Sequence, residues 1–246
     1  MWRSSPGLVQ ESAWRTAPTT RSIISQGLSA AGEWRRLKPL FPPLAGKCVL
    51  DLGCGYGWHC RYSVEKGAEQ VLGIDLSGKM IQEARRRNAH VRIEYLVCGI
   101  EEYGYPENRW DCVISNLALH YIGDISQVFR NVHRTLRPDG IFLFNIEHPV
   151  FTAGGQDWAY AEDGRPRYWP IDDYFMPGER KARFCGCEVA KQHHTLTQIA
   201  MGLLENGFEI QALEEAVPPA EMMDVPGTED ELRRPMMLLI KAKAKK

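Results

Sequence analysis

The sequence predicts an α/β fold built on a doubly wound, mostly parallel sheet with helices on both faces. Two observations lead to this prediction. Between residues 48 and 146, short apolar segments alternate with segments of helical periodicity, as in consecutive strand–helix–strand units. Two more apolar segments lie near the C-terminus and can close the sheet, which gives seven strands in total.

Each expected strand is a short apolar run bounded by polar residues or glycine. The seven runs are residues 48–52, 70–76, 91–97, 110–119, 140–146, 208–216 and 233–244. The helices expected between them are residues 57–66, 77–87, 125–136 and 196–204. Ser77 stands where an N-cap is needed, and Gly207 stands just after the end of a helix.

Two regions depart from this alternation. Residues 1–45 are expected to form an N-terminal arm with cap helices, and residues 46–246 form the main domain. The cap residues expected to pack against that domain are Trp34, Leu37 and Leu40. Residues 150–190 lack clear periodicity and are rich in glycine, proline and aromatic residues. Because long segments of this kind are commonly functional loops, we expect a lid-like insertion after the fifth strand.

The polar and aromatic side chains of this insertion are open to two interpretations. They could shape a substrate pocket, or they could form a packing cluster that keeps a long loop ordered. The residues concerned are Trp158, Trp169, Asp172, Tyr174 and Arg180. The aromatic content argues only against disorder, so both interpretations stay open at this point.

The composition is that of a globular protein without a strong charge imbalance. The chain has 246 residues, of which 25% are charged, with a formal net charge of −1. That balance gives no electrostatic reason to expect a nucleic-acid or membrane partner. No apolar run reaches the length that a membrane-spanning helix needs. The seven cysteines lack a zinc-finger spacing, and Cys185 and Cys187 are interpreted as loop thiols. We therefore expect no metal and a cytoplasmic location.

A glycine-rich segment, D-L-G-C-G-Y-G, directly follows the first expected strand. Gly53, Gly55 and Gly57 allow the backbone to bend sharply and to approach a ligand closely. The loop joins a strand to a helix, so the ligand is expected at the carboxyl edge of the sheet. The spacing differs from the dinucleotide fingerprint, whose third glycine would fall at Trp58, and from the phosphate-binding P-loop. Asp51 would repel a phosphate and suits a cation.

Five motifs in this order resemble those of class I S-adenosylmethionine-dependent methyltransferases. The glycine loop resembles their first motif, and "GIDLSGKM", in which Asp75 ends the second strand, resembles the second. The segments "CGIEEY" and "DCVISNLALHYI" resemble the third and fourth motifs. The segment "LRPDGIFLF" resembles the turn before strand five, with Asp139 where glycine is usual. The resemblance implies a Rossmann-like sheet and S-adenosylmethionine as cofactor.

The resemblance also implies which residues bind the cofactor. Asp75 would accept hydrogen bonds from the ribose hydroxyls, and Ile100 would cover a face of the adenine or would simply belong to the core. Asn116 and Leu117 would line the cofactor through their backbone. The full set is Asp51, Gly53, Cys54, Gly55, Asp75, Leu76, Gly99, Ile100, Asn116 and Leu117.

Roughly residues 21–242 are similar to a narrower, type 11-like family of bacterial methyltransferases whose substrates are largely unassigned. The similar stretches are "GLSAAGEW", "SNLALHYI", "EHPVFTA", "YWPIDDYF", "GERKA", "KQHHTL" and "RRPMMLLI". The chain departs from this family at Asn116 and Asn145, where serine is usual, and at His194, where arginine is usual. The first 20 residues do not match the expected aromatic-rich arm. The departures lie on the expected substrate side.

The candidate catalytic residues follow the fourth and fifth strands. Methyl transfer requires an aligned acceptor and, for some acceptors, a base that removes a proton. His120 and Tyr121 follow strand four and His148 follows strand five, so these three residues are expected at one edge of the sheet. His193 is also considered as a base. Each histidine could instead satisfy a loop hydrogen bond.

The predicted function is methyl transfer from S-adenosylmethionine to a small-molecule acceptor. One alternative is a protein of this fold that binds the cofactor but has altered catalysis. An RNA methyltransferase is disfavoured, because amino-methylating enzymes of nucleic acids carry [DN]-P-P-[YFW] where this chain has "SNLAL". A nicotinamide oxidoreductase is disfavoured by the glycine spacing.

Overall fold

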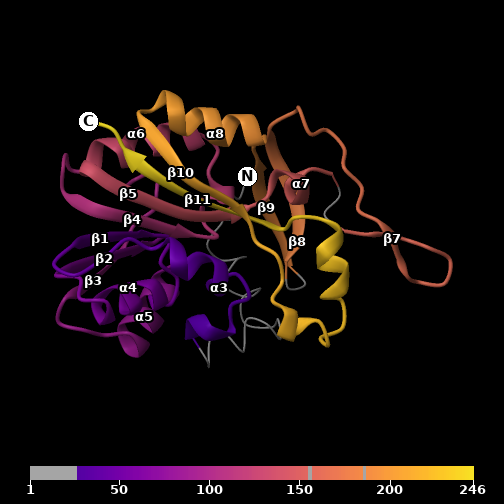
Figure 1. Cartoon of the computed structure of the whole chain (residues 1–246), viewed down its shortest axis with the longest axis horizontal. Helices are drawn as coiled ribbons and strands as arrows, with labels where there is room; N and C mark the ends of the chain where they lie inside the picture. The colour runs from indigo at the N-terminus through magenta and orange to yellow at the C-terminus, as the bar shows by residue number, and fades with distance from the viewer. Residues whose placement is uncertain (1–26, 155–156, 185–186) are drawn as a thin grey trace, which may run out of the picture.

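The computed structural model describes residues 27–154, 157–184 and 187–246 (Figure 1). Its central sheet has seven strands in the order β10–β11–β5–β4–β1–β2–β3. The strands are β1 (Cys48–Leu52), β2 (Gln70–Asp75), β3 (Ile93–Val97), β4 (Trp110–Asn116), β5 (Leu136–Glu147), β10 (Phe208–Glu215) and β11 (Met237–Ala244). The five strands β1 to β5 pair in parallel, and β11 runs antiparallel to both of its neighbours. The predicted doubly wound, seven-stranded sheet is confirmed.

Helices cover both faces of the sheet, with α6 and α8 on one face and α4 and α5 on the other (Figure 1). Their bounds are α4 (Trp58–Glu65), α5 (Gly78–Arg87), α6 (Ile125–Thr135) and α8 (Leu196–Glu205). Successive strand residues point to opposite faces. Leu50 of β1 therefore packs in the cluster that contains Phe129 and Leu203, whereas Val49 packs in the cluster that contains Val64 and Ile81. The expected N-cap at Ser77 is also confirmed, because its side chain accepts a hydrogen bond from the amide of Met80.

Within the described residues, the N-terminal cap contains three short helices, η1 (Gly27–Ala30), α3 (Trp34–Leu37) and η2 (Lys38–Leu40). Leu37 is 1% exposed and packs against Leu143 of β5 and Leu239 of β11. Trp34 makes an edge-to-face contact with Tyr62 of α4, with ring centroids 4.8 Å apart. The predicted packing residues therefore fasten the cap to the sheet and to α4. The expected arm over residues 1–26 lies outside the described residues.

The insertion after β5 contains regular structure that its sequence does not signal. It begins with a one-turn helix, α7 (Pro149–Thr152), and continues as two antiparallel hairpins. The hairpins are β6 (Ala159–Tyr160) with β7 (Pro166–Tyr168), and β8 (Gly178–Phe184) with β9 (Cys187–His193). The pattern was missed because β8 is rich in arginine and lysine and shows no apolar alternation. Of the two cysteines interpreted above as loop thiols, Cys185 lies outside the described residues, and Cys187 begins strand β9, so it is not a loop residue.

The aromatic residues of the insertion pack around one arginine of the C-terminal region. The Arg234 guanidinium lies 4.3 Å from the Trp169 ring centroid and 5.3 Å from that of Trp158. Arg234 is 7% exposed and also pairs with Glu231 at 2.7 Å. The Tyr174 hydroxyl accepts a hydrogen bond from the amide of Leu196. For Trp158, Trp169 and Tyr174, these contacts support the interpretation that they order the loop.

The Asp172 carboxylate accepts a hydrogen bond from the Asp173 amide at 2.9 Å. Arg180 is likewise held by its own loop. Its guanidinium donates hydrogen bonds to the carbonyl groups of Asp173 and Met176.

Within the described part of the chain, no helix is long and apolar enough to cross a membrane. In the same residues, no group of three or more histidine, cysteine, aspartate or glutamate side chains could hold a metal ion.

We predict that Leu37→Ala destabilises the protein, because it empties a fully buried site between the cap and the sheet. Removing a buried leucine side chain costs about 2–5 kcal/mol. The measurement is urea unfolding followed by circular dichroism. Leu232→Ala is the matched control, because Leu232 is 54% exposed. If both variants lose the same small amount of stability, the cap does not depend on the Leu37 contact.

Candidate functional site

The glycine loop turns between β1 and α4 with three residues in the left-handed region. The φ angles of Gly53, Gly55 and Gly57 are 73°, 52° and 76°. A Cβ atom at Gly53 would lie 2.4 Å from the Ala118 side chain, and one at Gly57 would lie 2.3 Å from the Tyr95 hydroxyl. A Cβ atom at Gly55 would meet nothing within 4 Å. The outer glycines are thus required by packing, while the middle one faces open space.

Asp75, at the end of β2, fastens the loop to the neighbouring strand. One carboxylate oxygen accepts a hydrogen bond from the Gly55 amide at 2.9 Å, and the other accepts one from the Ser77 amide at 2.9 Å. A carboxylate offers about four acceptor positions, so each oxygen of Asp75 can accept a further hydrogen bond. Burial raises the pKa of Asp75, and its two amide donors oppose that effect.

Asp51, two residues before the loop, is 1% exposed and only half satisfied. Its Oδ2 atom accepts a hydrogen bond from the Cys60 thiol, with the sulfur 3.2 Å away. Its Oδ1 atom has no hydrogen-bond partner among the described residues. Burial raises the pKa of Asp51 to about 7. The unpartnered oxygen of a buried acid can pair with a cationic group of a ligand.

The loops after β3 and β4 meet the glycine loop. Ile100 is 9% exposed, and its Cδ1 atom lies 3.8 Å from the position that a Cβ of Gly53 would take. Leu76 directly follows β2 and is 52% exposed. In the loop after β3, the Gly99 amide donates a hydrogen bond to the Glu102 carboxylate at 3.3 Å. Cys54 is buried within the glycine loop. Residues predicted from three separate segments therefore lie at one edge of the sheet.

Asn116 and Leu117 end β4 in a strained and polar environment. Leu117 has a φ angle of 55°, and its amide donates to the Asn145 carbonyl at 2.8 Å. The Asn116 side chain accepts a hydrogen bond from the Asn145 amide group at 2.9 Å and donates one to Glu33 at 3.4 Å. Both asparagines stand where the similar family has serine, and here they bond to each other.

Glu33 is a member of this network that sequence reasoning missed. It lies in the N-terminal cap, is 8% exposed, and burial raises its pKa. The only signal was an acid beside a tryptophan in the stretch "GLSAAGEW". Its partner Asn116 is 83 positions away in the sequence, so the pairing depends on how the cap docks onto β4.

His120 lies in the turn η3 (Leu119–Tyr121) that follows β4. It is 3% exposed, and burial lowers its pKa to about 4, so the ring is neutral at pH 7. Its Nε2 atom is 3.9 Å from a carboxylate oxygen of Glu147, and its Nδ1 atom has no hydrogen-bond partner among the described residues. The Tyr121 ring lies beside it, with centroids 4.4 Å apart.

The other two candidate bases already have partners on both ring nitrogens. His148 accepts a hydrogen bond from the Val150 amide on Nδ1, and its Nε2 lies 3.0 Å from a Glu215 oxygen. His193 contacts the Thr152 hydroxyl and the Tyr174 carbonyl, at 2.7 and 2.9 Å. These are the loop hydrogen bonds that were the alternative interpretation. His120 is the one of the three with an unpartnered ring nitrogen.

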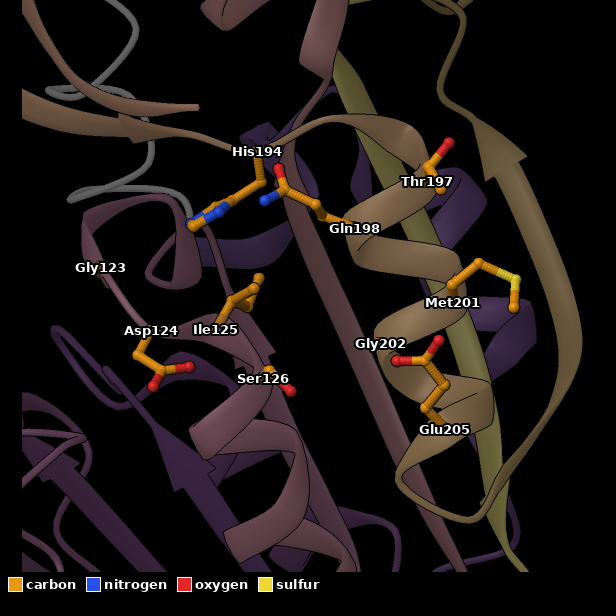
Figure 2. A pocket seen from close by; sticks show the side chains of 10 residues that line it. All are labelled: Gly123, Asp124, Ile125, Ser126, His194, Thr197, Gln198, Met201, Gly202 and Glu205. Carbon is orange, nitrogen blue, oxygen red and sulfur yellow. The ribbon is translucent and has the colours of Figure 1, made fainter. Parts of the chain in front are cut away.

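A pocket of about 330 Å³ lies elsewhere, between the start of α6 and one face of α8. Figure 2 shows its lining side chains, which include Asp124, His194 and Glu205. None of the predicted cofactor-binding or catalytic residues lines this pocket. The candidate site is therefore the carboxyl edge of the sheet around the glycine loop, and the pocket is separate from it.

Comparisons with known proteins identify the family and agree with the fold. Residues 50–144 match the family model described as a methyltransferase domain. The solved structure of a Listeria monocytogenes protein assigned to the S-adenosylmethionine dependent methyltransferases superposes with a TM-score of 0.85. It is 46% identical, and the match covers 89% of this chain and 100% of that chain. An S-adenosylmethionine dependent methyltransferase from Mesorhizobium loti is 39% identical, with a TM-score of 0.79 and coverages of 88% and 100%.

A more distant relative has a named substrate. The malonyl-[acyl-carrier protein] O-methyltransferase of Salmonella typhimurium is 40% identical over 97 residues, which is 39% of this chain and 37% of that protein. Because the two solved structures match almost their whole length at high identity, the comparison decides the family. The chain belongs to the S-adenosylmethionine-dependent methyltransferases.

Proposed function

We propose that the cofactor lies across the glycine loop. The ammonium group of its amino acid end points toward Asp51, and its ribose points toward Asp75. The open space beside Gly55, the unpartnered oxygen of Asp51 and the remaining acceptor positions of Asp75 support this arrangement. The adenine is assigned to the edge formed by Leu76, Gly99 and Ile100. The remaining residues assigned to line the cofactor are Gly53, Cys54, Asn116 and Leu117.

The acceptor is proposed to be a small molecule in the cytoplasm. The chain has a net charge of −1, which gives no electrostatic reason to expect a nucleic-acid partner. The end of β4 also lacks the [DN]-P-P-[YFW] sequence. The relative from Salmonella typhimurium is named for methylating a malonyl group, which is a small acyl group. The insertion over residues 150–190 is proposed to act as a lid over this acceptor.

His120 is proposed as the general base, and its unpartnered Nδ1 atom is the observation that carries the assignment. When bound, S-adenosylmethionine supplies an electrophilic methyl group, so the protein's task is to align the acceptor and to remove its proton. A neutral ring with a free lone pair on Nδ1 can accept a hydrogen bond from the acceptor's N–H or O–H. Tyr121 is proposed to orient the ring. His148 is assigned to positioning α7, because both of its nitrogens are engaged.

The Asp51 assignment predicts that cofactor binding depends on pH. Below pH 7 the free carboxyl is protonated, and a ligand whose ammonium group pairs with the ionised form must displace that proton. Affinity for S-adenosylhomocysteine should therefore rise roughly tenfold from pH 5.5 to 6.5 and level off above pH 7.5. Isothermal titration calorimetry measures this, with Asp51→Asn as the control that lacks the titrating group. Affinity that does not change over this range would remove Asp51 from the cation site.

The base assignment predicts that His120→Asn separates binding from turnover. The variant should bind S-adenosylhomocysteine as the native protein does, yet its turnover should fall by about 10²–10⁴-fold, because general-base catalysis contributes that much. The measurement is release of S-adenosylhomocysteine across a panel of metabolites. His90→Asn, just before β3 at the opposite edge of the sheet, is the control. Retained turnover in His120→Asn would refute the role of His120.

A further inference from the structure

Three titratable side chains from three separate elements form a buried cluster at the carboxyl edge of the sheet. His120 comes from η3, Glu147 from the end of β5 and Lys191 from β9 of the second hairpin. Their side chains are 3%, 12% and 3% exposed. The Lys191 ammonium donates to the Glu147 oxygen that lies 3.9 Å from Nε2 of His120. A buried ion pair therefore lies on the Nε2 side of the His120 ring.

The cluster is not fully satisfied by the protein. Nδ1 of His120 and Oε2 of Glu147 are both buried and have no hydrogen-bond partner among the described residues. Buried polar atoms without partners are rare in native proteins and cost stability, so each one calls for an explanation. Two such atoms lie in this cluster, and one of them belongs to the proposed base. This indicates that a bound ligand supplies their missing hydrogen-bond partners.

Lys191 is fixed in place from two sides. Besides its ion pair with Glu147, its ammonium lies 5.7 Å from the centroid of the Phe151 ring in α7. Phe151 is in turn stacked on Trp169, with ring centroids 5.3 Å apart. The contacts with Glu147 and Phe151 therefore fix the Lys191 ammonium, which comes from the β8–β9 hairpin, in one position beside β5.

We propose that Glu147 and Lys191 are a positioning pair for His120. Glu147 holds the ring with the Nε2 hydrogen toward its carboxylate, so that the lone pair on Nδ1 faces the acceptor, and Lys191 holds Glu147 in place through their ion pair. This inference rests on the proposed function of His120. As the acceptor would form its bond to the methyl group and the methyl–sulfur bond would break, with the electron pair staying on sulfur, the acceptor's proton would pass to Nδ1. The ring would then gain one positive charge, which the Glu147 carboxylate would stabilise.

The two partners act on the ring in opposite directions. Glu147 favours the protonated ring, and Lys191 disfavours it, as does the neighbouring His194 just after β9. These are the titratable groups that face His120 from β5, from β9 and from the segment that leads into α8. The pair thus keeps the free base neutral and still stabilises the positive charge once the proton arrives. The hairpin contributes to the base because it carries Lys191.

The experiment is nuclear magnetic resonance of the histidine rings in the full chain bound to S-adenosylhomocysteine. The His120 signals are assigned by their loss in His120→Asn. At pH 7 the ring nitrogens should have the shifts of the Nε2–H tautomer. The Nδ1–H tautomer would overturn the proposal. Because the tautomer is measured on the unmodified chain, this test does not require a folded Lys191 or Glu147 variant.

The second measurement is the pKa of the His120 ring in lysine variants. Lys191→Met should raise it by roughly one pH unit or more, because the opposing cation is gone. Lys191→Arg keeps the charge and should leave it unchanged. Lys181→Met removes an exposed lysine of the same hairpin and is the matched control. An unchanged or lower pKa in a folded Lys191→Met variant would overturn the proposal.

The outcomes separate this inference from the function on which it rests. If His120→Asn retains turnover, the assignment of His120 as base fails. If His120→Asn loses turnover while Lys191→Met leaves the pKa of His120 unchanged, only the positioning pair fails. If His120→Asn loses turnover while the tautomer is Nδ1–H, His120 is still required, but both the positioning pair and the assignment of Nδ1 as the accepting atom fail.

Discussion

The geometry of the cofactor side depends on the carboxylate of Asp75. The parallel pairing of β1 with β2 sets Leu52 opposite Ile74, so the glycine loop and the end of β2 emerge side by side. Asp75 joins them, because one oxygen accepts from the Gly55 amide and the other from the Ser77 amide at the start of α5. One acid therefore shapes the loop, fixes the entry to the next helix and keeps acceptor positions for a ligand.

The two sides of the site handle charge differently. The proposed cofactor side holds the buried acid Asp51 and the half-buried acid Asp75, which suit a ligand that carries positive charge. On the other side, the ion pair of Glu147 with Lys191 has no net charge, and His120 is neutral. Methyl transfer from a sulfonium removes the positive charge from sulfur and leaves a proton to be taken up elsewhere. The arrangement is consistent with uptake of that proton at His120.

Much of the cofactor side could be predicted from sequence because its features are local. Glycines at positions 53, 55 and 57 indicate a left-handed backbone within a single turn. An acid at the end of a parallel strand, such as Asp75, lies at the carboxyl edge of the sheet. Glu33 and Lys191 could not be found this way. Their partners, Asn116 and Glu147, are 83 and 44 positions distant, and only the docking of the cap and the hairpin brings them together.

The most direct test of the account is a crystal structure with S-adenosylhomocysteine bound. We expect the ribose hydroxyls to bond to Asp75, the amino group to approach Asp51, and the sulfur to face the side of the His120 ring that carries Nδ1. A cofactor that lies away from the glycine loop, or a sulfur that faces away from His120, would contradict the account.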